Sequence, residues 1–305
     1  EATGFVMPEG TTTFLCPQSG AMGGFARTSP SYETPYKMDE AMGKNGWGFG
    51  YTFPCLFRNN DKGWVLVSET GVTSAYCASH LEGKPDGLYT IAFPESDEFN
   101  GNGTSAPGIA LPGETPWRTI TIGTTLEPIV ETTVAFDVVK PLYEPSQAYQ
   151  YGCGTWSWII AGDGSMNYET QKKYIDFSAA MGYQSVLVDA LWDTQVGRER
   201  LEELARYAKE KGVALYLWYN SNGYWNDAPQ GPRGLMHNII ARRKEMKWMK
   251  SIGIRGIKVD FVGSDKQVAM QMYEEILADA NDYGLLVIFH GCTLPRGWER
   301  MYPNF

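Results

Sequence analysis

The stretch GIRGIKVDFVGSD (residues 253–265) contains a short apolar run that carries one lysine and one aspartate two residues apart. Side chains alternate between the two faces of a β-strand, so Lys258 and Asp260 share one face while Ile257 and Val259 share the other. The run therefore predicts a buried strand that reserves one face, near its end, for two opposite charges.

Similar strand-like runs recur from residue 154 onward, with a helical pattern between successive copies. The expected strands lie near 154–160, 185–190, 213–219, 255–261 and 285–290, and the expected helices near 168–182, 198–211, 236–252 and 265–283. A glycine follows each helix (Gly182, Gly212, Gly253 and Gly284), where a left-handed residue commonly ends a helix. Four helices that end in the same way indicate four equivalent βα units.

Strict alternation of strands and helices predicts a parallel sheet, either an open doubly wound sheet or a (β/α)8 barrel. A closed barrel needs eight strands, and five are recognisable before the sequence stops at RMYPNF (300–305). We therefore expect residues 154–305 to form the first half of a catalytic TIM barrel, with about five βα units, in an incomplete copy of a longer protein.

Residues 1–139 have a different pattern. The segments WVLVSETGV (64–72), GLYTIAFPE (87–95) and WRTITIG (117–123) are short, rich in β-branched and aromatic residues, and separated by clusters of turn-forming residues. They predict a β-sandwich domain or part of one. Residues 140–153, which include KPLYEPSQAYQYG, have two prolines and no periodicity, so we expect a linker there.

The composition, with 43% hydrophobic residues in 305, is that of a globular protein with large cores. The net charge of −9 argues against a nucleic-acid partner, and we expect the basic cluster at 242–244 to be a solvated helix face. No apolar run approaches the length of a membrane span. The five cysteines contain no C-x-x-C pair, although one bridge, for example between Cys55 and Cys77, stays open.

Functional side chains of parallel α/β proteins gather at the C-terminal ends of the strands. This rule selects Trp156, Trp158, Asp189, Trp192, Trp218, Asn220, Lys258, Asp260, His290 and Arg296. Aromatic rings stack on pyranose faces while carboxylates and amides bind hydroxyls, so the set indicates a sugar site. The sequence contains no nucleophile-elbow, zinc-protease or P-loop motif that would indicate a different chemistry.

Asp260 is the strongest candidate for a reacting group. A neighbouring ammonium favours the ionised carboxylate, which suits a nucleophile better than an acid. A structural ion pair between Lys258 and Asp260 is the alternative interpretation. Other candidates also have structural alternatives: a loop contact for Asp189, a structural hydrogen bond for His290 and a loop ion pair for Arg296. The tryptophans could be core residues, and we expect this of at least one of Trp156 and Trp158.

Seven segments, taken in order, resemble glycoside hydrolase family 97: FRNNDKGWVLVSETGV, TPWRTITIG, GTWSWI, VLVDALW, LWYNSNG, GIKVDF and FHGCTLPRGWERMYPN. The resemblance implies an N-terminal β-super-sandwich, a central (β/α)8 barrel and a small C-terminal β-domain. This chain would hold the later part of the first domain, the first five units of the barrel and none of the third domain.

The family has an inverting branch active on α-glucosides and a retaining branch described on α-galactosides and related sugars. The base glutamates of the inverting branch fall at Asn220 and Gly291 here, whereas the retaining-branch carboxylate falls at Asp260. The resemblance thus implies a retaining glycosidase, with α-galactosides as the leading substrate, Asp260 as nucleophile and Lys258 binding a sugar hydroxyl. The acid/base glutamate is expected beyond Phe305. The remaining substrate contacts would come from Asp189, Trp192, Trp218, Asn220, His290, Arg296 and Trp158.

Further expectations depend on the same resemblance. Calcium is expected in the full-length protein, with Glu69 of VSETGV as a ligand; an exposed strand-end glutamate is the alternative for that residue. An oligosaccharide or α-galactoside substrate and a periplasmic or secreted location are also implied. Two other functions stay open: an α-glucosidase of the same family, and a non-catalytic carbohydrate-binding or scaffold protein.

Overall fold

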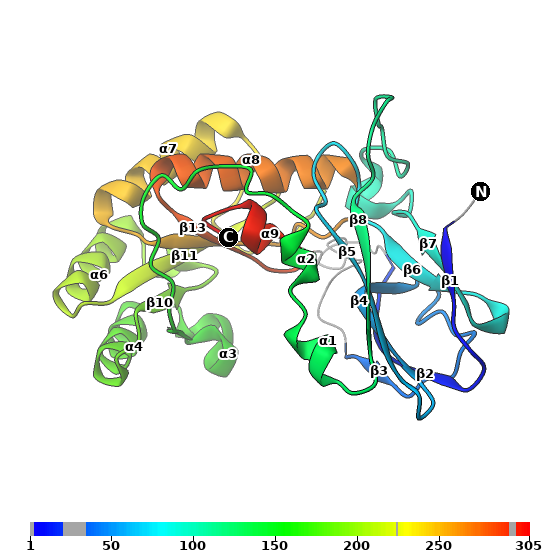
Figure 1. Cartoon of the computed structure of the whole chain (residues 1–305). Helices are drawn as coiled ribbons and strands as arrows, with labels where there is room; N and C mark the ends of the chain where they lie inside the picture. Colours follow the sequence, from blue (N-terminus) through cyan, green and yellow to red (C-terminus); the bar gives the residue numbers. More distant parts are fainter. Residues whose placement is uncertain (1–2, 21–34, 224, 293–296) are drawn as a thin grey trace. The chain divides into compact units, whose positions relative to one another are not determined.

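The computed structural model describes residues 3–20, 35–223, 225–292 and 297–305, and the chain divides into two compact units (Figure 1). Unit 1 comprises Glu1–Leu142, Gly263–Glu274 and Gly291–Tyr302. Unit 2 comprises Tyr143–Val262, Glu275–His290 and Pro303–Phe305. Two short pieces from the second half of the sequence therefore belong to the unit that the first half builds.

Unit 1 contains an antiparallel sheet, and its described strands number eight. They are β1 (Gly4–Val6), β2 (Thr11–Pro17), β3 (Lys37–Met38), β4 (Tyr51–Asn59), β5 (Gly63–Thr70), β6 (His80–Gly83), β7 (Leu88–Ala92) and β8 (Trp117–Gly123). The path β1-β7-β6-β4-β2-β3 is branched, because β5 pairs with both β4 and β8. The strands expected at 64–72, 87–95 and 117–123 are confirmed as β5, β7 and β8. Short helices complete the unit: η2 (Pro85–Gly87), η3 (Glu98–Gly101), α1 (Glu127–Glu131), α2 (Val134–Asp137) and α9 (Trp298–Met301).

The core of unit 1 lies under one face of β4. Alternate residues Tyr51, Phe53, Cys55 and Phe57 have no exposed surface, and they pack with neighbours from β2, β5, β6 and β7. Burying one such aromatic side chain contributes about 2–3 kcal/mol, so this face stabilises the sheet strongly. The possible bridge to Cys77 is not formed: Cys77 is a free thiol, and burial raises its pKa to about 12.

Unit 2 contains five described parallel strands in sequential order: β9 (Gly154–Trp156), β10 (Ser185–Val188), β11 (Ala214–Asn220), β12 (Gly256–Asp260) and β13 (Leu286–Phe289). The intervening helices are α3 (Trp158–Ala161), η4 (Gly162–Ser165), α4 (Tyr168–Met181), α5 (Trp192–Gln195), α6 (Arg198–Glu210), α7 (Ile239–Ile252) and α8 (Gln267–Tyr283). A doubly wound sheet would reverse its strand order at a switch point, and this one does not. The order is that of part of a (β/α)8 barrel.

The helix ends follow the expected chemistry. α4 and α7 end at Gly182 and Gly253, which have φ of 72° and 81° and donate their N–H groups to the last turn. Any residue with a Cβ would be strained in this left-handed conformation. α7 begins at Ile239, three residues later than expected, because the Asn238 side chain accepts from two N–H groups of the first turn.

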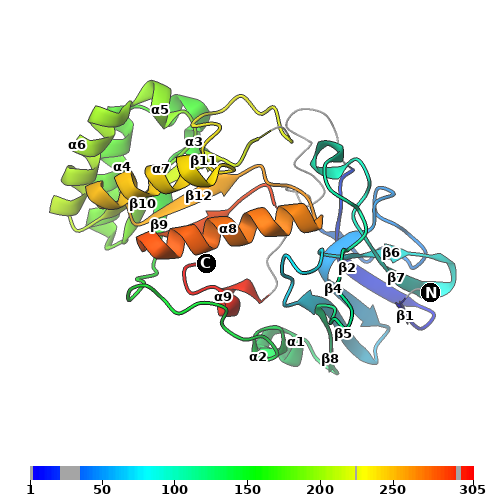
Figure 2. The same ribbon diagram turned by 90° about the horizontal axis from the view of Figure 1, so that it is seen from above.

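Two expectations are wrong in detail. The strand expected at 154–160 ends at Trp156, and Ser157 has helical dihedrals that start α3. The basic cluster at 242–244 is not fully solvated, because Arg242 is only 1% exposed. Its guanidinium lies 2.6 Å from Asp279 of α8, and α7 and α8 lie side by side in the views of Figure 1 and Figure 2. A buried carboxylate partner accounts for the buried charge.

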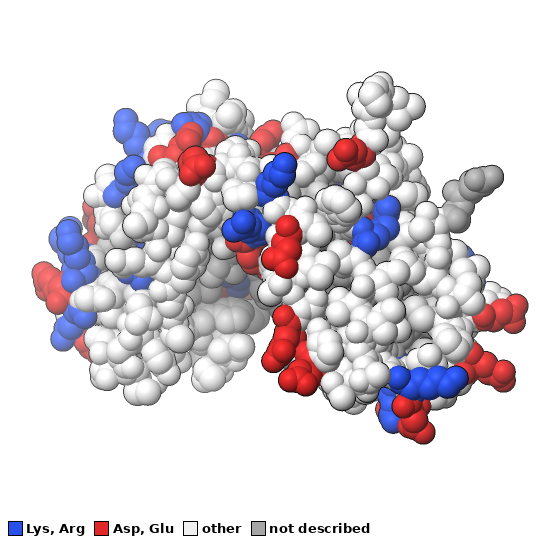
Figure 3. All heavy atoms as spheres, in the orientation of Figure 1, with Lys and Arg blue, Asp and Glu red and all other residues white. Residues whose placement is uncertain are grey.

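On the face shown in Figure 3, lysines and arginines are interspersed with acidic and uncharged residues. Among the described helices, none is both long enough and apolar enough to cross a membrane.

Candidate active site

The two charges of β12 lie against side chains from the neighbouring strands of unit 2. The Lys258 ammonium is 3.0 Å from Asp189 Oδ2, at the end of β10, and 3.6 Å from Asp260 Oδ2. It also lies 4.1 Å from the centre of the Trp156 ring at the end of β9. All three charged side chains are at most 6% exposed, so their attraction acts in a poorly solvated environment. Lys258 thus joins two carboxylates that the sequence separates by 71 residues.

Hydrogen-bond donors surround the Asp260 carboxylate. Its Oδ2 accepts from Trp218 Nε1 at 2.9 Å, and its Oδ1 accepts from the Phe261 N–H at 2.8 Å. His290 Nδ1 lies 3.3 Å from Oδ1 and 3.2 Å from Oδ2. Burial pushes the pKa of Asp260 upward, but the bond from His290 and the charge of Lys258 outweigh it, and the pKa lies below its usual value. The carboxylate is therefore ionised at neutral pH and held in one orientation.

The aromatic residue at this cluster is Trp156 rather than Trp158. The Trp156 ring meets His290 edge to face at 6.1 Å, and its indole N–H is buried without a hydrogen-bond partner among the described residues. Trp158 lies in α3, is 39% exposed, stacks on Trp156 at 5.7 Å and donates to Asp163. The sequence selected both tryptophans, but the strand was expected to continue to residue 160. A buried donor without a partner can bind an acceptor such as a hydroxyl oxygen.

Two residues that were predicted to contact the substrate, Trp192 and Asn220, are buried and bonded to other parts of the protein. Trp192 has no exposed surface, stacks on Trp248 at 5.9 Å and donates from Nε1 to the Trp218 carbonyl oxygen. Asn220 is also fully buried: its Nδ2 donates to two carbonyls of the following loop, and its Oδ1 accepts from the N–H of Asn222. Neither side chain has a polar group facing solvent. Asn220 holds the loop after β11 in shape.

Two further predicted residues, Asp189 and His290, lie in unit 2. Asp189 uses Oδ1 to accept from the Ala190 N–H and Oδ2 to bind Lys258, so both of its oxygens have partners. His290 is the most accessible member, with 27% of its side chain exposed. Arg296 lies outside the described residues. The structure therefore brings together Asp189, Lys258, Asp260 and His290 with the indoles of Trp156 and Trp218.

Glu69, the expected calcium ligand, is at the end of β5 in unit 1. It is fully buried, so the exposed alternative is wrong. Its Oε1 accepts from the Ser79 N–H, and its Oε2 accepts from the Ser79 hydroxyl and from Arg118. No group of three or more metal-binding side chains occurs among the described residues. These residues on their own therefore do not fit a calcium ion.

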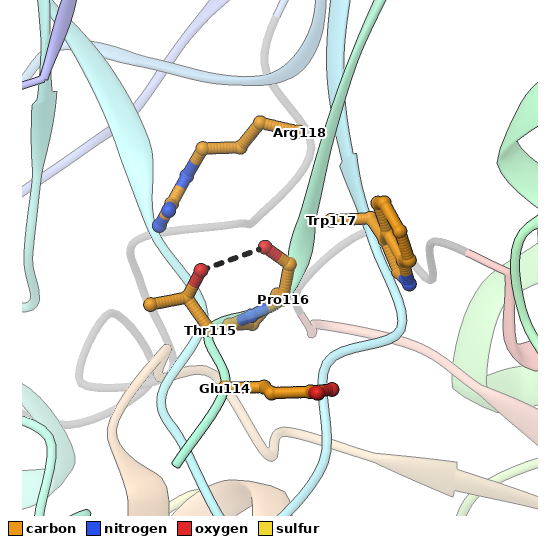
Figure 4. A pocket seen from close by; sticks show the side chains of 5 residues that line it. All are labelled: Glu114, Thr115, Pro116, Trp117 and Arg118. Atoms are coloured by element: carbon orange, nitrogen blue, oxygen red, sulfur yellow. Dashed lines mark hydrogen bonds between the residues drawn. The ribbon is translucent and has the colours of Figure 1, made fainter. Parts of the chain in front are cut away.

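A cavity of about 400 Å³ lies at the start of β8, and Arg118, the partner of Glu69, is part of its lining. It is lined by Glu114, Thr115, Pro116, Trp117 and Arg118, and the Thr115 hydroxyl donates to the Pro116 carbonyl (Figure 4). Among the residues that the structure describes, one continuous segment provides this lining.

Comparison with known families assigns both halves of the chain. A sequence model described as Glycosyl-hydrolase 97 N-terminal matches residues 1–141, and one described as Glycoside hydrolase 97 matches residues 149–305. The chain belongs to glycoside hydrolase family 97. The resemblance found in the seven sequence segments is thereby confirmed, as is the fold class of a β-domain followed by part of a barrel.

Three proteins illustrate what the chain is similar to. A probable retaining α-galactosidase of Streptomyces bingchenggensis is 27% identical over 79% of this chain and 37% of its own length. The crystal structure of a β-arabinopyranosidase is 62% identical, with a TM-score of 0.95 over 99% of this chain and 48% of that one. A family 97 enzyme of Pseudoalteromonas sp. strain K8, in complex with acarbose, shares the fold at 18% identity, with a TM-score of 0.72 over 100% of this chain and 49% of that one. The chain spans about half, or less, of the length of each.

Proposed function

We propose that the full-length protein is a retaining glycosidase in which Asp260 is the nucleophile. The observation that carries this proposal is the ionised, buried carboxylate at the end of β12, fixed by donors from Trp218, Phe261 and His290. A carboxylate nucleophile must be ionised and correctly oriented when the substrate binds, and this arrangement meets both requirements.

The reaction would proceed in two displacements. Asp260 attacks the anomeric carbon while the bond to the leaving oxygen breaks, and a carboxylic acid gives that oxygen its proton. Water then attacks the same carbon, passes a proton to the ionised acid/base and releases Asp260 as a carboxylate. Retention needs the acid/base about 5–5.5 Å from the nucleophile. We place that group beyond Phe305 on the family resemblance.

The inverting alternative lacks its base in this chain. The two positions that match the base glutamates of the inverting branch are Asn220 and Gly291. An amide whose polar atoms bind the protein cannot take a proton from water, and a glycine has no side chain. Both residues therefore favour retention, and they disfavour an α-glucosidase of the inverting type.

The proposed substrate is a terminal β-L-arabinopyranoside. The 62% identity with a β-arabinopyranosidase supports this choice over the 27% identity with the probable α-galactosidase. The two sugars share the same arrangement from C1 to C4, and α-D-galactosides only add a hydroxymethyl group at C5. An α-galactosidase is therefore the second candidate, since a pocket that excludes one such group discriminates by about 1–3 kcal/mol.

Two experiments on the full-length protein test this proposal. Asp260→Gly should abolish turnover of an aryl glycoside, and added azide should restore part of it as the glycosyl azide of inverted configuration. If the variant keeps full activity without azide, Asp260 is not the nucleophile. The ratio of kcat/KM for p-nitrophenyl β-L-arabinopyranoside, α-D-galactopyranoside and α-D-glucopyranoside then ranks the substrates. No turnover of any of them by the wild type would support a non-catalytic carbohydrate-binding protein.

Calcium and location are proposed on the family resemblance alone. Glu69 would supply one oxygen ligand to a calcium ion in the full-length protein, after exchange of its bond to Arg118. Removal of calcium by a chelator should lower the melting temperature of the full-length wild type, and Glu69→Gln should remove that effect. We also propose a periplasmic or secreted location, which cell fractionation would test.

A further inference from the structure

Phe261, the residue after the proposed nucleophile, has an unusual backbone conformation. Its φ is +65°, in the left-handed region that residues with bulky side chains rarely adopt. Backbone strain of this kind persists only where surrounding contacts maintain it, and it is common at functional sites. The contacts around Phe261 show what the conformation does here.

The Phe261 N–H contacts Asp260 directly, and the Phe261 ring contacts a second residue that binds Asp260. Its N–H donates to Asp260 Oδ1 at 2.8 Å and also points at the His290 carbonyl oxygen, 3.2 Å away. Its ring meets the Trp218 ring edge to face at 5.8 Å, and Trp218 donates to the other oxygen of Asp260. Phe261 therefore supplies one donor directly to the carboxylate and packs against the residue that supplies another.

Asn226 holds the other side of this turn. Its Nδ2 donates to the Phe261 carbonyl oxygen at 3.1 Å, and its Oδ1 accepts from the Ala228 N–H at 3.2 Å. The side chain is only 4% exposed, and Nδ2 also lies 3.3 Å from Asn220 Oδ1. The loop after β11 is thus tied to the residue that follows the nucleophile on β12.

We propose that Asn226 is a positioning residue for the nucleophile: its amide maintains the left-handed conformation of Phe261, and the Phe261 N–H in turn fixes the orientation of Asp260. This inference rests on the proposed role of Asp260 and adds a residue that does not touch the substrate. Without the amide, the Phe261 carbonyl would lose this bond, the backbone dihedrals at Asp260 and Phe261 would change together, and the Phe261 N–H would lose its alignment with the carboxylate. A misplacement of about 1 Å at a reacting group can lower the rate about 100-fold.

The first test compares three variants of the full-length protein with an aryl glycoside as substrate. Asn226→Asp keeps the size of the side chain but removes the Nδ2 donors, and Asn226→Ala removes the whole group. Asn222→Ala is the matched control, because this similarly buried neighbour accepts from the Gly234 N–H within its own loop. We expect both Asn226 variants to lower kcat about 10- to 100-fold with KM changed less than about threefold. The control should stay within about threefold of wild type in both.

The second test asks whether the backbone conformation or the ring is what matters at residue 261. Phe261→Gly loses the ring but adopts positive φ without strain, whereas Phe261→Val keeps apolar bulk but strongly disfavours it. If the left-handed turn positions Asp260, kcat should be higher for Phe261→Gly than for Phe261→Val. If only packing against Trp218 matters, the order should be reversed. The reversed order would overturn the inference.

A third measurement separates this inference from the proposed function. The rate at which a 5-fluoroglycosyl fluoride labels the protein, followed by intact mass, reports formation of the glycosyl-enzyme. Labelling at Asp260 in wild type, and slower labelling in both Asn226 variants, supports both proposals. No labelling of wild type contradicts the nucleophile itself. Normal labelling and kcat in Asn226→Asp and Asn226→Ala would refute the positioning role while leaving the nucleophile in place.

Discussion

Two buried carboxyl groups in this chain have opposite acid–base behaviour. Asp260 of unit 2 and Glu98 of unit 1 are 4% and 2% exposed. The pKa of Asp260 lies below its usual value, whereas burial and the neighbouring Asp265 raise the pKa of Glu98 to about 8. Burial alone therefore does not decide the charge of a carboxyl group.

The difference comes from the groups that face each carboxyl. The bond from His290 lowers the pKa of Asp260 most, and the charge of Lys258 lowers it further. Lys258 contacts the Asp189 carboxylate and lies close to that of Asp260. In unit 1, the Lys266 ammonium donates to the carbonyl oxygens of Ser96, Glu98 and Asn102. These bonds direct the Lys266 ammonium to a loop and not to the Glu98 carboxyl group. The Glu98 carboxyl group lies close to a second acid, Asp265. A buried carboxyl group is prepared for nucleophilic attack only when cations and donors face its oxygens.

The largest expected effect comes from matched amide substitutions of the two groups in the full-length protein. Asp260→Asn removes the attacking charge and should lower kcat about 10⁴-fold or more. Glu98→Gln replaces a group that is mostly protonated at pH 7 with a neutral one, so kcat should stay within about twofold. Steady-state kinetics at pH 7 measures both.

Equal losses of activity in the two amide variants would contradict the assignment. Circular dichroism and melting temperature serve as the control, since Asp260→Asn must remain folded for its kinetics to count. The comparison would also fail if Asp260→Asn kept more than about a tenth of wild-type activity.

The second prediction concerns the pH dependence of stability. A carboxyl group whose pKa is raised on folding favours the folded state fully below its unfolded value of 4.5, and this contribution is lost as the pH rises toward 8. The interval corresponds to about 5 kcal/mol. Urea denaturation at pH 5 and pH 8 should show that wild type loses stability over this range, and Glu98→Gln should remove most of the loss. Identical pH profiles would show that Glu98 titrates normally.

Much of the fold could be predicted from local signals. Glycines at 182 and 253 end their helices as expected, and the sequential alternation of strands and helices matches the observed order of β9 to β13. The end of β9 was missed because Trp156, Ser157 and Trp158 fit the strand pattern, and only the observed turn at Ser157 distinguishes them. Arg242 was placed in solvent because its partner, Asp279, lies 37 residues away on another helix.

The candidate site was predicted only where a local pattern determines the positions of its side chains. Strand alternation alone places Lys258 and Asp260 on one face, and the observed distance of 3.6 Å agrees with it. Strand periodicity could not show that the Asn220 amide is used by its own loop, or that Asn226 reaches the Phe261 carbonyl, because these bonds depend on the path of an irregular loop. The raised pKa of Glu98 likewise depends on a neighbour 167 residues away in the sequence.

The third prediction concerns the loss of the Lys258 ammonium, whose charge helps to lower the pKa of Asp260. Lys258→Met keeps most of the side-chain volume but leaves Asp189 and Asp260 buried without their common ammonium. Breaking a buried pair in this way costs about 3–5 kcal/mol of stability. The pKa of Asp260 should rise, so its contribution to the acid limb of kcat/KM should move to higher pH. Chemical denaturation and a pH–rate profile on the full-length protein measure the two effects, and an unmoved acid limb would argue against the coupling.

The smallest effect concerns a single donor. Trp218→Phe removes the 2.9 Å bond to Asp260 Oδ2 but keeps an aromatic ring against Phe261. A hydrogen bond to a charged group contributes about 1.5–3 kcal/mol, so kcat should fall about 10- to 100-fold, and the acid limb should move slightly to higher pH. Trp248→Phe is the matched control, because this indole also donates at 2.9 Å to a carboxylate, that of Glu202 on α6. A fall in kcat in both variants would indicate general destabilisation. A fall confined to Trp218→Phe would show that donors on the carboxylate oxygens, beyond burial and the lysine, prepare Asp260 for attack.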